Sequence, residues 1–193
     1  MPQQEQAAFS RFSCMLIPMN GSRIRLPREE VSVYSAKYTY ELEDSLEELI
    51  LTVLQQGFLT KGQLLTLGRW KSNRITHHLV KNSENLVQET TTLALATRSV
   101  RLAPQILMAM DGVGLPIASS ILHWCHKDVF PILDFRALWS MGIEMPRVYS
   151  LGFWEGYVTQ WREVQTEWGC EKRDLDRALW QYSKEHQPQS PAT

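Results

Sequence analysis

Two glycines separated by one valine, Gly112-Val113-Gly114, lead into an apolar run that is compatible with a helix. Glycine permits a positive φ and lets another backbone or a phosphate come close, and Pro116 is tolerated in the first turn of a helix. These residues predict a tight turn that ends at a helix N-terminus. Such a terminus presents unpaired N–H groups, which suit a phosphate oxygen. A Gly-x-Gly turn is also common as a simple connection between two helices, without any ligand.

Asp134 is the acidic residue for which the sequence offers the clearest chemistry. It follows the apolar run Phe130–Leu133 and precedes the helix-like stretch Phe135–Trp139. A carboxylate can stabilise positive charge that develops in a reaction, and at this place it can equally accept N–H bonds as a helix N-cap. The two roles can coexist, and the residues alone leave both open.

The stretch Gly68–Lys81 is basic and contains no acidic residue. It could contact the backbone of DNA, and the residues that we assign to that contact are Arg69, Lys71, Asn73 and Arg74. The alternative is a solvated helix end, since cations are favoured near helix C-termini. The adjacent His77 and His78 should point in different directions on a helix or a strand, so we expect no metal site there.

Two tryptophans, Trp70 and Trp124, could form a surface on which a base stacks, with burial in the core as the alternative. The other five tryptophans fall in predicted helices at spacings that suit packing. We therefore expect a structural role for these five, which are Trp139, Trp154, Trp161, Trp168 and Trp180.

The elements that must position these side chains are predicted to be helices throughout. Apolar residues recur at every third or fourth position from Leu42 to Leu54 behind an acidic start, and Gly57 is placed to end that helix. Only Val31–Tyr34 has a pattern that would allow a short extended piece. Further helices are predicted around residues 62–72, 83–97, 103–110, 116–127, 134–142, 153–169 and 175–185.

The predicted organisation is one helical domain over residues 26–186, which could comprise two lobes. An N-terminal segment, 1–25, is expected to be partly disordered, and residues 187–193 have the composition of a flexible tail. The chain has 193 residues, 44% of them hydrophobic, which is enough for one good core or two small lobes.

Composition narrows the partners and cofactors of this chain. The formal net charge is −1, with 20 basic and 21 acidic residues, so a nucleic-acid contact must come from a local patch. The three cysteines lie far apart, which predicts neither a CxxC metal site nor a disulfide framework, and we expect no cofactor. No signal-peptide or bilayer-spanning pattern is recognisable, so we expect a cytoplasmic monomer without a membrane partner.

The string MDGVGLPIASSILHWCHKDVFPILDFRALW, residues 110–139, resembles the helix-hairpin-helix DNA glycosylase superfamily, which contains endonuclease III and the adenine glycosylases. In this resemblance Met110–Gly114 corresponds to the hairpin, Ile117-Ala118 to the start of the second helix, and Phe130–Asp134 to the segment that delivers the catalytic acid. It implies an all-α, helix-hairpin-helix glycosylase-like fold, a double-stranded DNA partner with a flipped nucleotide, and a catalytic role for Asp134. Together with the basic cluster, it gives the predicted DNA-binding set Gly112, Val113, Gly114, Arg69, Lys71, Asn73, Arg74 and Arg136.

The sequence also departs from that superfamily. The bifunctional members carry a nucleophilic lysine two residues after the second glycine, where this chain has Pro116. Only Cys170 follows the region of Asp134, so the four-cysteine iron–sulfur cluster of endonuclease III-like enzymes is not expected. The resemblance therefore implies a monofunctional DNA repair glycosylase that hydrolyses the N-glycosidic bond of a damaged or modified base. The alternatives are an inactive DNA-binding module of the same fold and a helical protein with no DNA role.

Overall fold

The computed structural model of the chain describes residues 24–40 and 43–188, with the side chains of Asp44 and Ser45 outside that description. The described residues form ten α-helices and two 3-10 helices and contain no strand, which confirms the all-α prediction. The expectations for residues 1–23, for Leu42 and for residues 189–193 lie outside the described part.

The helices follow one another along the chain without long gaps. Two 3-10 helices, η1 (Arg28–Glu30) and η2 (Asn73–Ile75), accompany the ten α-helices. The α-helices are α1 (Val31–Lys37), α2 (Asp44–Gln56), α3 (Lys61–Lys71), α4 (Thr76–Leu79), α5 (Glu84–Ala96), α6 (Leu102–Leu107), α7 (Leu115–Cys125), α8 (Phe135–Ser140), α9 (Leu151–Trp168) and α10 (Lys172–His186).

Local sequence explains where several of these helices begin and end. Thr60 caps α3 in a reciprocal capping box with Gln63, and Ser150 accepts the N–H of Phe153 at the start of α9. Gly57 ends α2 in the left-handed conformation, with a φ of 80°, as the apolar pattern predicts. The extended piece allowed at Val31–Tyr34 is wrong, because these residues form the first turn of α1.

Helix α1 forms because it packs against α10, which lies at the other end of the chain. Val31 and Tyr34, three residues apart, are both buried, and the Tyr34 ring lies edge-on to Tyr182. The β-branched valines favour a strand locally, but burial of this helical face outweighs that preference. The N-terminal helix thus belongs to the same part of the molecule as the C-terminal helix.

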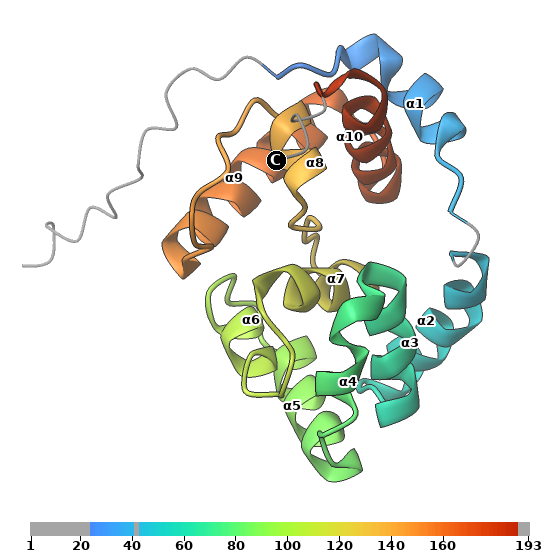
Figure 1. Ribbon diagram of the computed structural model, residues 1–193, viewed down its shortest axis with the longest axis vertical. Helices are drawn as coiled ribbons and strands as arrows, with labels where there is room; N and C mark the ends of the chain where they lie inside the picture. The colour runs from blue at the N-terminus through green and yellow to red at the C-terminus, as the bar shows by residue number, and fades with distance from the viewer. Residues whose placement is uncertain (1–23, 41–42, 189–193) are drawn as a thin grey trace, which may run out of the picture.

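Figure 1 shows the helices in two groups. One group, which we call the terminal lobe, contains α1, α8, α9 and α10. The other, which we call the central lobe, contains α2 to α7. The chain passes between the lobes twice, once between α1 and α2 and once between α7 and α8. Residues on these two connections can therefore face both lobes.

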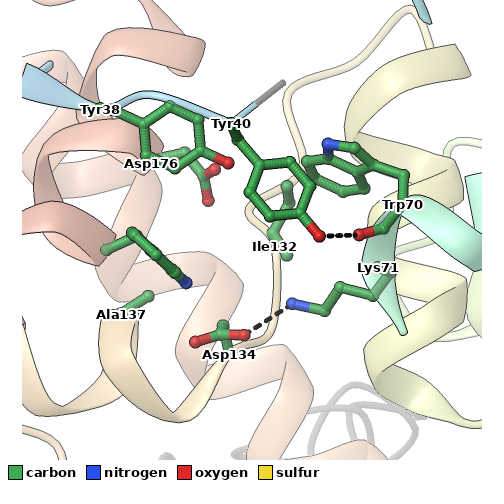
Figure 2. A pocket seen from close by; sticks show the side chains of 9 residues that line it. Tyr38, Tyr40, Trp70, Lys71, Ile132, Asp134, Ala137 and Asp176 are labelled. Carbon is green, nitrogen blue, oxygen red and sulfur yellow. Dashed lines mark hydrogen bonds and ion pairs between the residues drawn. The ribbon is translucent and has the colours of Figure 1, made fainter. Parts of the chain in front are cut away.

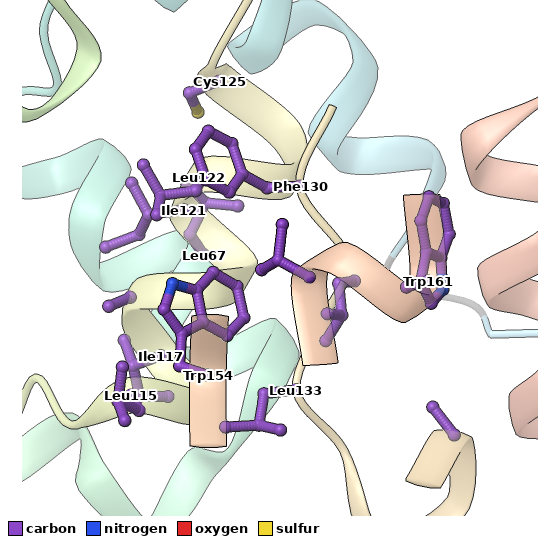
Figure 3. Close-up of a cluster of buried hydrophobic side chains, with 14 of the residues drawn as sticks. Leu67, Leu115, Ile117, Ile121, Leu122, Cys125, Phe130, Leu133, Trp154 and Trp161 are labelled. Carbon is purple, nitrogen blue, oxygen red and sulfur yellow. The ribbon is translucent and has the colours of Figure 1, made fainter. Parts of the chain in front are cut away.

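The core runs from the central lobe into the terminal lobe. Phe130 and Trp154 stack with ring centroids 6.2 Å apart, and Figure 3 shows them beside Leu67 and Ile121. The indole N–H of Trp154 donates to the carbonyl of Val100, 2.8 Å away. Because α9 reaches across in this way, the two lobes share apolar packing. In the described part of the chain, no helix combines the length and the apolar character needed to cross a membrane.

Candidate functional site

The extended segment Phe130–Asp134 is held in place by polar side chains on both lobes. The Leu133 N–H donates to the Ser119 hydroxyl on α7, at 2.9 Å, and the Tyr157 hydroxyl on α9 donates to the carbonyl of Ile132, also at 2.9 Å. The buried His123 ring pairs its Nδ1 with the carbonyl of Phe130, at 2.8 Å. These bonds give partners to three backbone groups of a segment that has no strand partner. These bonds fix the position of the carboxylate that follows.

The turn between α6 and α7 is anchored by a residue that the sequence does not single out. Asn82 is buried, accepts the N–H of Asp111 at 2.8 Å, and donates to the carbonyl of Asp111 at 2.9 Å. Gly112 adopts a φ of 78°, and a Cβ there would lie 2.7 Å from the Cβ of His78. Gly112 is therefore required by the fold itself, because the turn packs closely against α4.

Gly114 has a different environment. It is exposed, its φ of −93° and ψ of 177° are open to any residue, and a Cβ there would meet nothing nearer than the Cδ of Pro116, at 3.8 Å. Its N–H has no acceptor among the described residues. The packing against α4 gives Gly112 a structural role, and the expectation that the two glycines face a phosphate stays a prediction. Val113, between them, is buried and packs in the core rather than facing solvent.

Asp134 is the N-cap of α8, and it also forms an ion pair. One carboxylate oxygen accepts the N–H of Arg136 at 2.9 Å, and the other accepts the Lys71 ammonium at 2.8 Å (Figure 2). The side chains of Lys71 and Asp134 are only 12% and 19% exposed. Burial raises the pKa of Asp134, but the Lys71 charge and the hydrogen bonds outweigh burial and hold that pKa below its ordinary value. Asp134 is therefore a carboxylate at neutral pH.

A cavity of about 120 Å³ lies beside Asp134, between the two lobes. Figure 2 shows Tyr40 and Trp70 along one side of it, and the Tyr40 hydroxyl donates to the carbonyl of Trp70 at 3.2 Å. The cavity volume is below the roughly 150 Å³ of a cavity that holds benzene, so an aromatic ring would enter fully only if the lining moved apart. The full lining is Tyr38, Tyr40, Trp70, Lys71, Ile132, Asp134, Ala137, Asp176 and Trp180.

A buried cluster of charges supports the cavity from behind. Arg173 and Arg177 of α10 both donate to Glu43, which comes from the connection between α1 and α2. The Arg173 guanidinium also lies over the rings of Trp70 and Trp124, at 5.6 and 4.9 Å from their centroids. Burial raises the pKa of Glu43, but the two arginines outweigh burial and lower it overall, so the cluster holds the aromatic lining against α10 as ion pairs.

The predicted DNA contacts fall in three different environments. Arg69, Asn73 and Arg74 are exposed at the end of α3 and in η2, as a backbone contact requires. Lys71 instead points inward and pairs with Asp134, and its contact with the DNA backbone stays a prediction. The reason is its place at the last turn of α3, which faces the connection that carries Asp134. The guanidinium of Arg136 lies over the Trp180 ring, 5.2 Å from its centroid.

The tryptophans also divide differently from the prediction. Trp154 and Trp161 are fully buried, as a structural role demands. Trp180, assigned to the same structural group, lines the cavity instead. Trp70 lines it too, whereas Trp124 packs edge-on behind Trp70 and is not part of the lining. Of the two predicted stacking residues, the structure therefore brings only Trp70 to the cavity.

The histidine pair was expected to diverge, and that expectation is wrong. The rings of His77 and His78 are both exposed, and their centroids lie 3.9 Å apart with an angle of 41° between the ring planes. In the described part of the chain, no three His, Cys, Asp or Glu side chains gather in a way that could hold a metal ion.

Comparisons with known proteins do not indicate a function for this site. No protein-family model, curated protein or solved structure matches the chain.

Proposed function

We propose that the chain is a DNA-binding protein of the helix-hairpin-helix glycosylase type, and that it hydrolyses the N-glycosidic bond of a damaged or modified base. The observation that carries the proposal is an ionised Asp134 on the rim of a cavity that is lined by aromatic rings. An enzyme that acts on a base must receive the flipped base in such a pocket.

The turn before α7 supplies the phosphate contact in this proposal. The N–H of the exposed Gly114 lies at the start of an 11-residue helix, where a phosphate oxygen is favoured. The first turn of that helix is linked to the residue before the acid, because Ser119 donates to the carbonyl of Pro116 and accepts the N–H of Leu133. A phosphate held at Gly114 would thus be in a fixed relation to the carboxylate of Asp134.

In this proposal the cavity binds the flipped base, and Asp134 acts on the sugar. A flipped base stacks among Tyr40, Trp70 and Trp180. The Asp134 carboxylate stabilises the oxocarbenium-like sugar and orients the attacking water. Each carboxylate oxygen can accept more than one hydrogen bond, so the cap to Arg136 does not exclude this role. The phosphate backbone of a bound strand offers Lys71 a second anionic partner beside Asp134.

A second candidate, a DNA-binding module without turnover, is favoured by one observation. The Lys71 ammonium sits directly on Asp134, and a cation at that place disfavours a second positive charge on the sugar. If Lys71 stays there when DNA binds, the fold retains binding and loses chemistry. The two candidates differ in whether any base is released.

The test is incubation of the protein with duplexes that each carry one damaged or modified base, followed by alkali to cut the abasic sites. The proposal expects free base from at least one duplex and strand cutting only after alkali. Pro116 has no amine, so borohydride should trap no covalent adduct. An adduct on Lys71 would contradict the hydrolytic assignment. Salt-dependent duplex binding without release of any base would favour the second candidate.

A further inference from the structure

Asp176 is a second carboxyl group in the cavity that Asp134 borders (Figure 2). It lies on α10, in the terminal lobe, and is only 6% exposed. Its Oδ2 contacts the guanidinium of Arg173, and its Oδ1 has no partner among the described residues. The sequence gives no sign of this placement, because Asp176 lies more than forty residues after Asp134 in a helix that reads as structural.

The charged groups around Asp176 come from several elements of the fold. Arg173 is its partner on the same helix, but Arg173 also donates to Glu43 through two nitrogens, and Arg177 donates to Glu43 as well. Glu43 thus supplies a negative partner for both arginines. The titratable and charged groups that face Asp176 are Arg173 on α10, Glu43 before α2, Lys71 on α3, Asp134 before α8, Tyr38 after α1 and Tyr157 on α9.

The two carboxyl groups of the cavity differ in their pKa values. Burial raises the pKa of Asp176 to about 6, although Arg173 and Lys71 act in the opposite direction. Burial also opposes ionisation of Asp134, but there the Lys71 ion pair prevails and the pKa is lowered. When two neighbouring carboxyl groups have pKa values pushed apart, one is suited to donate a proton and the other to remain charged.

We propose that Asp176 is the general acid of the excision reaction, which protonates the departing base while Asp134 stays ionised beside the sugar. This inference rests on the proposed function. The geometry that supports it is the open Oδ1 of a buried carboxyl group in the cavity that would receive the base. Protonation matters because a neutral base is a much better leaving group than its anion.

The step balances as a hydrolysis. The bond between C1′ and the base nitrogen breaks, its electron pair stays with the base, and the Asp176 proton neutralises the base. Water then forms a bond to C1′ and gives a proton to the Asp134 carboxylate. Exchange with solvent restores the proton of Asp176 and the charge of Asp134. The net change consumes one water, and Arg173 remains in contact with the carboxylate that Asp176 becomes.

The wild-type protein gives the first readout. Single-turnover excision should slow about tenfold per pH unit above pH 6, as the protonated fraction of Asp176 falls. The same measurement is then made on an analogue of the processed base that carries an electron-withdrawing halogen. That base leaves readily as an anion, so its excision should lose much of this pH dependence. An unchanged slope with the halogenated base would overturn the inference without the need for any variant.

The variant Asp176→Asn gives the second readout, with Asp174→Asn as the matched control. Asp174 lies on the same helix, but its side chain accepts the Ser35 hydroxyl at 2.8 Å, outside the cavity. Asp176→Asn should excise about 10²- to 10⁴-fold more slowly, with a flat profile above pH 6, and should lose much less on the halogenated base. Asp174→Asn should behave as wild type.

The outcomes separate this inference from the function on which it rests. If Asp134→Asn abolishes excision while Asp176→Asn keeps the wild-type rate and pH profile, Asp176 is not the acid and the proposed function stands. If the wild-type protein releases no base from any duplex, both fall together. Should Asp176→Asn fail to fold, the pH profiles of the wild-type protein on the two bases decide the question.

Discussion

Replacing Gly112 and Gly114 separately with alanine tests the division of roles in the turn before α7. The backbone at Gly112 is left-handed, and a Cβ would lie 2.7 Å from the Cβ of His78 and 3.3 Å from the N of Leu79. The backbone at Gly114 is extended, and the nearest atom to a Cβ is 3.8 Å away. The same substitution two residues apart should therefore act on stability at one site and on binding at the other.

The magnitudes follow from these surroundings. At Gly112, the left-handed conformation disfavours alanine by roughly 1–2 kcal/mol. Crowding against α4 adds about 1–3 kcal/mol, because the nearest atoms belong to helical backbone and a Cβ. At Gly114, the change should be neutral or stabilise by up to about 1 kcal/mol, since alanine restricts the unfolded chain. The free energies of unfolding of the two variants should therefore differ by several kcal/mol.

The assays are urea denaturation, followed by tryptophan fluorescence, and duplex binding measured by anisotropy at fixed salt. Gly114→Ala should fold as well as wild type and bind DNA roughly 10- to 100-fold more weakly, because the added methyl group hinders the close approach of a phosphate to the backbone N–H. Wild-type affinity of this folded variant would refute the phosphate contact. Equal destabilisation of both variants would refute the account of the turn.

Three further predictions concern the charges around the site. Lys71→Met should raise the pKa of Asp134, which carboxyl NMR can measure. It should also lower the free energy of unfolding at pH 7 by about 1–3 kcal/mol, because a largely buried carboxylate loses its partner. An unshifted pKa of Asp134 would contradict the ion pair. Neutralising the exposed Arg69 or Arg74 should in each case lower the magnitude of the slope of log K against log salt concentration by about one, as expected for the loss of one phosphate contact. An unchanged slope would assign the two arginines to a solvated helix end. Because the folded-state pKa of Asp176 is raised to about 6 from 3.8, its contribution to stability is present at low pH and is lost as the pH rises from about 4 to 6. Urea titrations between pH 4 and 6 should show that the free energy of unfolding of the wild type falls by about 3 kcal/mol more than that of Asp176→Asn. If the two free energies change with pH in parallel, the raised pKa of Asp176 is contradicted.

Local patterns predict much of the helical structure and the start of the site. The apolar stripe and Gly57 predict α2 and its end, and the position of Asp134 before a helix predicts its N-cap role. Both depend on neighbours in sequence, which a single sequence displays. The mistaken extended piece at Val31–Tyr34 shows the limit of this reasoning, because the packing of α1 on α10 joins opposite ends of the chain.

The chemistry of the cavity depends on contacts between distant residues. Lys71 meets Asp134 across 63 positions, and Asp176 enters the same cavity from α10. No spacing rule connects these residues, since the fold brings together the end of one helix, a connection and the face of another helix. Asn82 is a similar case, because a buried asparagine that bonds a turn 29 positions away looks like any loop residue in the sequence.

The most direct test of the proposed function compares excision by wild type and Asp134→Asn on every duplex that wild type processes. Asparagine retains the side-chain oxygen that caps α8 at Arg136, so the variant should fold with a loss of about 1–3 kcal/mol from the broken Lys71 pair. Asp128→Asn, in the loop after α7, is the matched control and should excise as wild type does. The account predicts that Asp134→Asn binds the duplex, remains folded and releases base at least 10²-fold more slowly, because the carboxylate charge is gone. Excision by the folded Asp134→Asn variant at the wild-type rate would contradict the account and leave Asp134 as a helix cap alone.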